Sequence, residues 1–389
     1  MMPAAPRGAI AIILGLTLVS TACQDSTTNP PVTPERQLVV SGRAERGSTV
    51  RFGVEAAGGS AVVPARDSIV SLVVTPADAA TVMADSAQLV ATGTLQVSAT
   101  LADQTVLTTT VLVAAPPTVV FEGLERTAGR DIYKIALDGG DLTRLTFNAA
   151  DDIQPSVAGD VVVFVSYRDR NGELYSIRLD GTGEQRLTNT RANETLPAVS
   201  PDGSKLAYAN DATGVTKVWI AARDLSGAAA LSSSTFSSPA SIETSPAWKS
   251  SSDQLMFVAT AGPAGRASLF TAPPTSGTVP TIVPSSGSTG AEFEPAWSPD
   301  GKRIAFALLV NGTTQIAVRD LPTSATTQLT SGTTSSGQPA WLPDGRLIFV
   351  RFLSSTSQEL AWLDLSQPSV VHTISITGLA AQHPSPVRP

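Results

Sequence analysis

The sequence predicts an all-β protein in which a β-sandwich is followed by a six-bladed β-propeller. Three observations carry this prediction: alternating apolar and polar residues over 37–115, a repeat of 42 to 49 residues over 118–389, and a composition poor in charge. With 42% hydrophobic and only 15% charged residues, the 389-residue chain is suited to short strands and turns rather than to long helices. Its length accommodates both regions.

The N-terminal segment, residues 1–22, has the pattern of an export signal. A single charge, Arg7, precedes an apolar run over 9–19 that is too short for a membrane span. The sequence Ser-Thr-Ala-Cys that follows, ending at Cys23, resembles a bacterial lipobox, although Ser20 stands where Leu is usual. The resemblance implies a lipid anchor on Cys23, while cleavage by ordinary signal peptidase after Ala22 remains the alternative.

The segment 23–36 is polar and rich in proline, and we expect it to be an extended tether. Cys23 is the only cysteine of the chain, so no disulfide forms within it and a catalytic thiol is not expected. The formal net charge of -7, without any run of Lys or Arg, argues against a nucleic acid partner.

Residues 37–115 contain short alternating runs separated by turn residues, which is typical of a β-sandwich. The stretch LVVTPADAATVMADSAQLVATGTLQVSATLAD also resembles the bacterial Ig-like (Big) domains of surface proteins. That resemblance implies a spacer or an adhesion module, and we favour the spacer.

After Pro116 and Pro117 the chain repeats itself. The clearest copies are EPAWSPDGKRIAFAL, QPAWLPDGRLIFVRF and LPAVSPDGSKLAYAN. The leading prolines of the copies are Pro155, Pro197, Pro246, Pro295, Pro339 and Pro384. Their spacing matches one four-stranded propeller blade per repeat. These copies resemble the WD-like repeats of the TolB family over about 118–389, which implies a propeller working with protein partners in the cell envelope.

The most prominent repeated residues have structural explanations. In the Ser-Pro-Asp-Gly turns, proline and glycine satisfy the backbone geometry of a hairpin, so we expect Asp202, Asp300 and Asp344 to be turn residues, not catalytic acids. The tryptophans that follow three of the leading prolines are expected to pack between blades. The segment 119–124 looks like a second strand without a first, and the C-terminal HPSPVRP like a first strand, so pairing the two closes the ring.

No catalytic centre is evident. The only histidines are His372 in an outer-strand segment and His383 at the start of an inner strand, where a channel-lining role is expected. No Gly-x-Ser-x-Gly elbow follows the last repeat, which argues against a peptidase. We therefore expect no enzyme activity and no cofactor, and the sequence does not decide whether a metal is bound.

Four carboxylates stand three residues before a leading proline: Asp152, Glu194, Glu243 and Glu292. Equivalent positions of a closed ring lie around one rim, so one hypothesis is an acidic channel rim that attracts a cation or a basic segment. The alternative is a set of solvated loop charges ahead of each strand.

Together these features predict a lipid-anchored protein of the periplasm or outer membrane. Its Ig-like spacer would present a propeller that binds another envelope protein or peptide without catalysis. The alternative function is a propeller that binds or degrades a surface polysaccharide.

Overall fold

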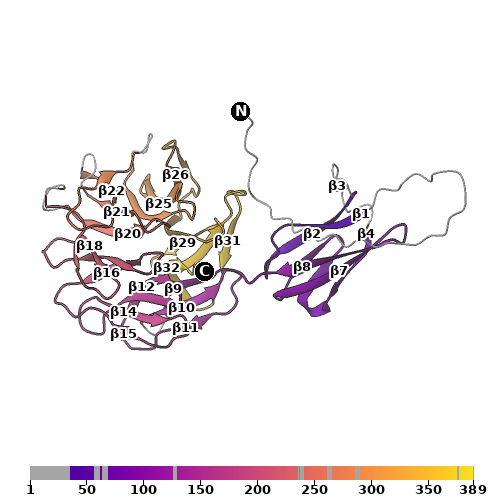
Figure 1. The fold of residues 1–389 in the computed structure, drawn as a ribbon, viewed down its shortest axis with the longest axis horizontal. Helices are drawn as coiled ribbons and strands as arrows, with labels where there is room; N and C mark the ends of the chain where they lie inside the picture. Colours follow the sequence, from indigo (N-terminus) through magenta and orange to yellow (C-terminus); the bar gives the residue numbers. More distant parts are fainter. Residues whose placement is uncertain are drawn as a thin grey trace, which may run out of the picture. The chain divides into compact units, whose positions relative to one another are not determined.

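The computed structural model describes residues 36–56, 62–63, 69–125, 129–234, 236, 241–260, 265–284, 290–374 and 376–388. The chain divides into two compact units, Met1–Pro116 and Pro117–Pro389 (Figure 1). The predicted signal segment, Cys23 and nearly all of the tether lie outside the described residues. Within the described part, no helix is long and apolar enough to cross a membrane.

The described part of the first unit consists of two antiparallel sheets. One has the strand order β1 (Arg36–Ser41), β2 (Thr49–Ala56), β6 (Ser86–Leu89) and β5 (Ala80–Met83), with β3 (Val62–Val63) also paired to β2. The other has the order β4 (Ile69–Thr75), β7 (Gly93–Leu101) and β8 (Val106–Val113). Alternate residues of both sheets, such as Phe52, Leu95 and Val111, form one hydrophobic core. The unit is therefore a two-layered β arrangement.

The second unit contains, in the described residues, six four-stranded antiparallel sheets, which we call blades 1 to 6. From the innermost strand outward, blade 1 is β32 (Leu379–Pro386), β9 (Thr118–Glu125), β10 (Arg130–Ala136) and β11 (Thr143–Arg144). Blade 2 is β12 (Asp152–Ala158), β13 (Val161–Ser166), β14 (Glu173–Arg178) and β15 (Gln185–Arg186). Blade 3 is β16 (Glu194–Val199), β17 (Lys205–Asn210), β18 (Lys217–Ala222) and β19 (Ala229–Ala230).

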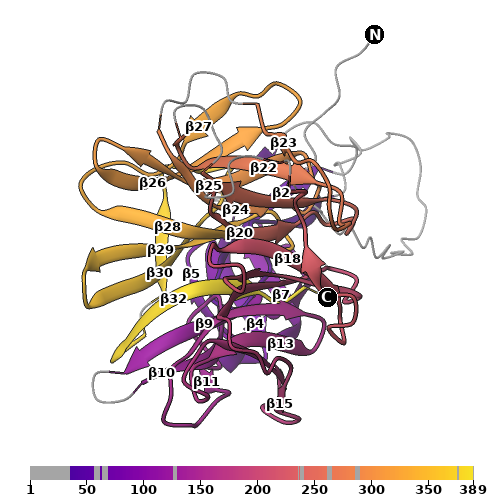
Figure 2. The same cartoon turned by 90° about the vertical axis from the view of Figure 1, so that its left-hand side faces the viewer.

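The remaining blades follow the same order. Blade 4 is β20 (Glu243–Trp248), β21 (Leu255–Ala259), β22 (Ser268–Ala272) and β23 (Thr281–Ile282). Blade 5 is β24 (Glu292–Trp297), β25 (Arg303–Val310), β26 (Thr313–Asp320) and β27 (Thr326–Gln328). Blade 6 is β28 (Ser335–Trp341), β29 (Leu347–Ser354), β30 (Ser357–Leu363) and β31 (Val371–Ile374). In Figure 2, β20 and β24 lie near the middle of the propeller and β11, β15 and β27 at its edge.

The ring closes through the two ends of this unit, as predicted. Strand β32 pairs antiparallel with β9, placing Ala381 opposite Gly123 and Ser385 opposite Val120. The innermost strands contact one another in the order β12, β16, β20, β24, β28, β32 and back to β12. Blade 1 is thus assembled from both ends of the propeller sequence, which leaves its inner strand paired rather than open.

The repeated turn and tryptophan residues have the structural roles predicted for them. In the turn after β16, Gly203 has a φ of 69°, and the Asp202 carboxylate accepts hydrogen bonds from the Ser200 hydroxyl (2.6 Å) and the Ser204 N–H (3.0 Å). The Trp248 indole N–H donates to the Ala198 carbonyl of the preceding blade at 2.8 Å, and the Trp341 indole to that of Ala296 at 3.2 Å. These tryptophans therefore pack between blades.

Candidate functional site

The centre of the propeller encloses a cavity of about 460 Å³. It is lined by the innermost strands of all six blades, each contributing its leading proline and the residues on either side of it. Proline has no N–H to donate. At a strand edge that faces the cavity no ladder hydrogen bond is needed, so proline is tolerated there. The site is therefore formed by one equivalent segment from each blade.

A β-bulge shapes each of these segments. The residue before each leading proline has a left-handed backbone, with φ between 48° and 54°, and the pairing with the second strand shifts at this point. These six residues are Gln154, Leu196, Ser245, Glu294, Gln338 and His383, and all of them line the cavity. Such bulges redirect a side chain, which here brings one side chain per blade to the cavity wall.

Side chains of this ring connect neighbouring blades. The Gln154 amide oxygen accepts a hydrogen bond from the Leu196 N–H at 2.8 Å, and the Glu294 carboxylate accepts one from the Gln338 N–H at 2.7 Å. The Gln338 amide oxygen likewise accepts from the His383 N–H at 2.8 Å. Three of the six ring residues, Gln154, Glu294 and Gln338, thus hold adjacent blades together and line the cavity at the same time.

The charged groups of the cavity centre on His383. Its Nδ1 lies 2.9 Å from the carboxylate of Glu122, a buried residue of β9, and its Nε2 lies 3.1 Å from the Gln338 amide nitrogen. Burial acts to lower the pKa of His383, but the carboxylates of Glu122 and Glu294 outweigh it and raise that pKa. Burial raises the pKa of Glu294. Arg388 also lines the cavity, so both signs of charge occur there.

The predicted acidic rim is wrong. Asp152, Glu194, Glu243 and Glu292 do not line the cavity, and each is 5% exposed or less. They are the first residues of β12, β16, β20 and β24, and they lie against the preceding or the same blade. The alternative, solvated loop charges, is equally wrong. The bulge separates these positions from the cavity wall, and the carboxylates contact cations or polar groups inside the protein.

His372 lies in an outer strand as the sequence indicated, and His383 lies in an inner strand, although in its middle and not at its start. His372 belongs to β31, the outermost strand of blade 6, where its ring stacks on Trp362 with centroids 3.9 Å apart. His383 lines the cavity from β32. Sequence reasoning missed Glu122, although an acid within the apolar run VVFEGL was a visible signal of a buried charge. The candidate lipidation residue, Cys23, lies outside the described residues.

Comparison with known proteins agrees with this geometry. A family model described as the TolB beta propeller domain (PD40) matches residues 115–270. None of the curated proteins matches the sequence. Among solved structures, TolB from Acinetobacter baumannii has a TM-score of 0.62 at 12% identity, covering 77% of this chain and 80% of that chain. Hydrazine synthase from Kuenenia stuttgartiensis has a TM-score of 0.55 at 14% identity, covering 70% of this chain and 46% of that one.

The fold and the central cavity define the chain as a β-propeller protein. More narrowly, it carries a TolB-like PD40 propeller repeat region. The family match ends within blade 4, but the pairing pattern and the left-handed ring residue continue unchanged through blades 5 and 6. At such low identities the likeness concerns the fold, since one propeller fold supports many unrelated functions.

Proposed function

We propose that this protein is a non-enzymatic scaffold of the cell envelope that binds an extended segment of another protein in the central cavity of its propeller. The observation that carries the proposal is the ring of six cavity-lining side chains, one from each blade, around a volume of about 460 Å³. Ligand sites typically measure about 300–1,000 Å³, so the cavity has room for a few side chains but not for a folded domain.

The lining supports a peptide ligand. The leading prolines offer apolar contact, while Gln154, Glu294 and Gln338 supply polar groups. A few polar groups set in an apolar wall are typical of sites that recognise a specific ligand. Glu294 and Arg388 would allow such a segment to present a charge of either sign.

Filling the cavity tests this proposal. We expect Ser245→Arg to reduce recovery of the crosslinked partner from the native envelope at least about 10-fold, because the new side chain occupies the ligand's volume. The ring position already holds Gln, Glu and His side chains in the same backbone conformation, so the substitution is compatible with the fold. Recovery is measured by pull-down of the full-length chain followed by quantitative mass spectrometry.

Thr327→Arg on β27 is the matched control, because it places the same side chain on the exposed outer strand of blade 5. It is expected to leave recovery unchanged. Equal recovery with Ser245→Arg and wild type would contradict the proposal. Retention of a polysaccharide that Ser245→Arg abolishes, without any protein partner, would favour the polymer-binding function instead.

We further propose that Cys23 is lipidated and that an Ig-like spacer, residues 37–115, connects this anchor to the propeller. The lipobox-like sequence and the TolB-like repeat region support an envelope location. Acyl chains contribute about 0.8 kcal/mol per buried methylene to membrane binding. Cys23→Ala is therefore expected to move most of the protein from the membrane to the soluble fraction on cell fractionation. Unchanged membrane association in this variant would rule out the anchor.

A further inference from the structure

The same two positions face each other at the boundaries between neighbouring blades. The first lies at the start of the third strand of one blade, and the second lies at the start of the innermost strand of the next blade. At three boundaries both positions are ionisable, and we call these the boundary pairs. They are Asp131 with Asp152, Glu173 with Glu194, and Lys217 with Glu243.

The boundary pairs differ in how their charge is balanced. In Lys217–Glu243 the ammonium lies 3.2 Å from the carboxylate. In Asp131–Asp152 each acid has its own arginine, with Arg144 lying 2.5 Å from Asp131 and Arg168 lying 3.2 Å from Asp152.

Glu173–Glu194 is balanced on one side only. Arg186 lies 3.3 Å from Glu173. In blade 2 the cation that binds Asp152 is Arg168, but the equivalent position of blade 3 is Ala212, so Glu194 lacks the corresponding cation. A buried carboxylate without a cation is strongly disfavoured. Within this pair, Glu194 therefore has the greater tendency to take up a proton.

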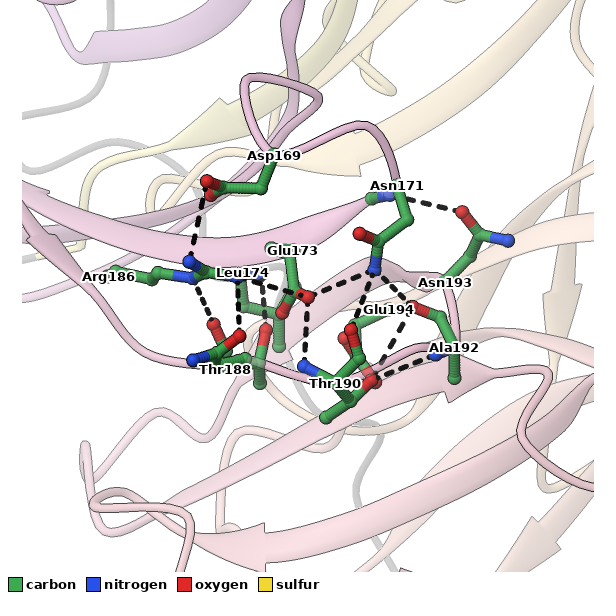
Figure 3. A network of polar contacts seen from close by, with 12 residues as sticks. Asp169, Asn171, Glu173, Leu174, Arg186, Thr188, Thr190, Ala192, Asn193 and Glu194 are labelled. Carbon is green, nitrogen blue, oxygen red and sulfur yellow. Dashed lines mark hydrogen bonds and ion pairs between the residues drawn. The ribbon is translucent and has the colours of Figure 1, made fainter.

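The hydrogen bonds around this pair leave one oxygen of each acid without a partner (Figure 3). Glu173 Oε1 accepts from the Asn171 amide and from the Thr190 N–H, each at 2.9 Å. Glu194 Oε1 accepts from the Thr190 hydroxyl and from the Asn210 amide, each at 2.8 Å. The two Oε2 atoms are buried without a hydrogen bond, and the side chains are 0% and 1% exposed.

We propose that Glu173 and Glu194 share one proton, which joins their two unpartnered oxygens in an O–H···O⁻ hydrogen bond and fastens blade 2 to blade 3. A single proton from solvent then satisfies both orphaned atoms and removes one of two buried negative charges. A hydrogen bond from a protonated carboxylic acid to an ionised carboxylate is among the shortest and strongest in proteins. This inference is independent of the ligand proposed above.

The surroundings indicate which acid holds the proton. Burial and the neighbouring Glu173 carboxylate raise the pKa of Glu194 to about 7. Burial also acts on Glu173, but the nearby Thr188 hydroxyl, the hydrogen bonds from Asn171 and the Thr190 N–H, and the Arg186 guanidinium outweigh it and lower its pKa. The proton therefore resides mainly on Glu194, and Glu173 stays ionised.

Within the part of the chain that the structure describes, Glu194 forms no ion pair with a cation. Arg186 also contacts Asp169 at 3.4 Å, and Asp211 is bonded to Asn193 beside the pair. Tyr208 on β17, whose pKa is raised to about 12 by burial and by Glu194, remains neutral. No cation on these neighbouring groups replaces the missing partner of Glu194.

The proton makes stability depend on pH in a definite direction. The folded chain holds the proton on Glu194 up to about pH 7, whereas the unfolded chain releases it near the ordinary value of 4.5. The folded state therefore binds more protons between these values, and its stability falls as the pH rises through this window. His383, whose pKa is also raised, contributes a fall of the same sign, so the test must isolate Glu194.

The test compares melting temperatures of the full-length chain at pH 5.5 and pH 8.5. Glu194→Gln replaces the shared proton by an amide donor, so we expect the wild type to lose several degrees more than this variant as the pH rises. Infrared spectra of the wild type should show a protonated carboxylic acid band at pH 5.5 that disappears by pH 8.5. The pKa values of Glu294, Asp131 and Asp152 are also raised, so only the part of the band that is lost in Glu194→Gln or in Glu173→Gln is assigned to the pair. The second variant keeps the test decisive if Glu194→Gln folds poorly.

Glu243→Gln is the matched control at the next boundary. It removes the partner of Lys217, so it is expected to lower the melting temperature at both pH values and to keep the wild-type pH dependence. The proposal is overturned if the wild type shows no acid band, or if its pH dependence equals that of Glu194→Gln. It is also overturned if Ca²⁺ added at pH 8.5 stabilises wild type but not Glu194→Gln, since the pair would then hold a cation.

Discussion

Removing residues 377–389 is expected to abolish cooperative folding of the propeller. The truncation deletes β32, so β9 loses its inner partner and blades 2 and 6 lose the strand that both of them contact. Domains are stable by only about 5–15 kcal/mol, and opening the ring exposes both an unpaired edge and the core of blade 1. Thermal unfolding followed by circular dichroism should show no sharp transition, and size-exclusion chromatography should show aggregates.

A chain ending after Val387 is the control, because it keeps β32 and the final hydrogen bond from the Val387 N–H to the Thr118 carbonyl. It should melt like the wild type. A synthetic peptide of residues 377–389 is expected to restore part of the transition when added to the truncated chain. If the truncated chain melts cooperatively at the wild-type temperature, β32 does not close the ring.

The substitution Arg319→Met is expected to lower the free energy of unfolding by about 3–5 kcal/mol. Arg319 is fully buried in β26, where its guanidinium binds both oxygens of the Glu292 carboxylate and donates to the Thr326 hydroxyl at 3.0 Å. Methionine fills a similar volume but leaves Glu292 as an uncompensated buried charge, which is the costly step. The free energy of unfolding is measured by urea denaturation.

A double variant separates charge from packing. Arg319→Met combined with Glu292→Leu removes both charges, and replacement of a buried ion pair by apolar residues is often neutral. We expect it to recover most of the stability lost by the single variant. If the double variant is as unstable as Arg319→Met, the loss comes instead from packing, for example from the contact of the guanidinium with the Phe306 ring at 4.7 Å.

The architecture was predictable because its signals are local and repeated. A proline every 42 to 49 residues marks each innermost strand, and the Asp-Gly turns mark the hairpins that follow. Six copies reinforce one another, so degraded copies such as QPSVAGDVVVFVS do not obscure the blade. The repeats at the two ends of the propeller sequence are each incomplete, which predicted that the ends pair to form one blade. The pairing of β32 with β9 confirms this prediction.

The lining of the cavity was not predictable in the same way. The predicted acidic rim assumed that each innermost strand is regular. A bulge at the residue before the proline changes which side chains face inward. Left-handed backbone is usually signalled by Gly or Asn, whereas here the position holds residues as different as Leu196 and His383. The charge pairing of Glu243 or Glu292 depends on contacts between blades that no local pattern reveals.

The left-handed backbone at the ring positions lets the side chains of the cavity wall differ from blade to blade while the strands keep one pairing pattern. A non-glycine residue in this conformation costs roughly 1–2 kcal/mol, yet the chain uses one in every blade instead of glycine. Each therefore projects a side chain inward from a backbone that is the same in all six blades. Exchanging Leu196, whose side chain has no hydrogen-bonding group, would alter the ligand's surroundings without disturbing strand register, so related propellers are free to diverge in what they recognise at such positions.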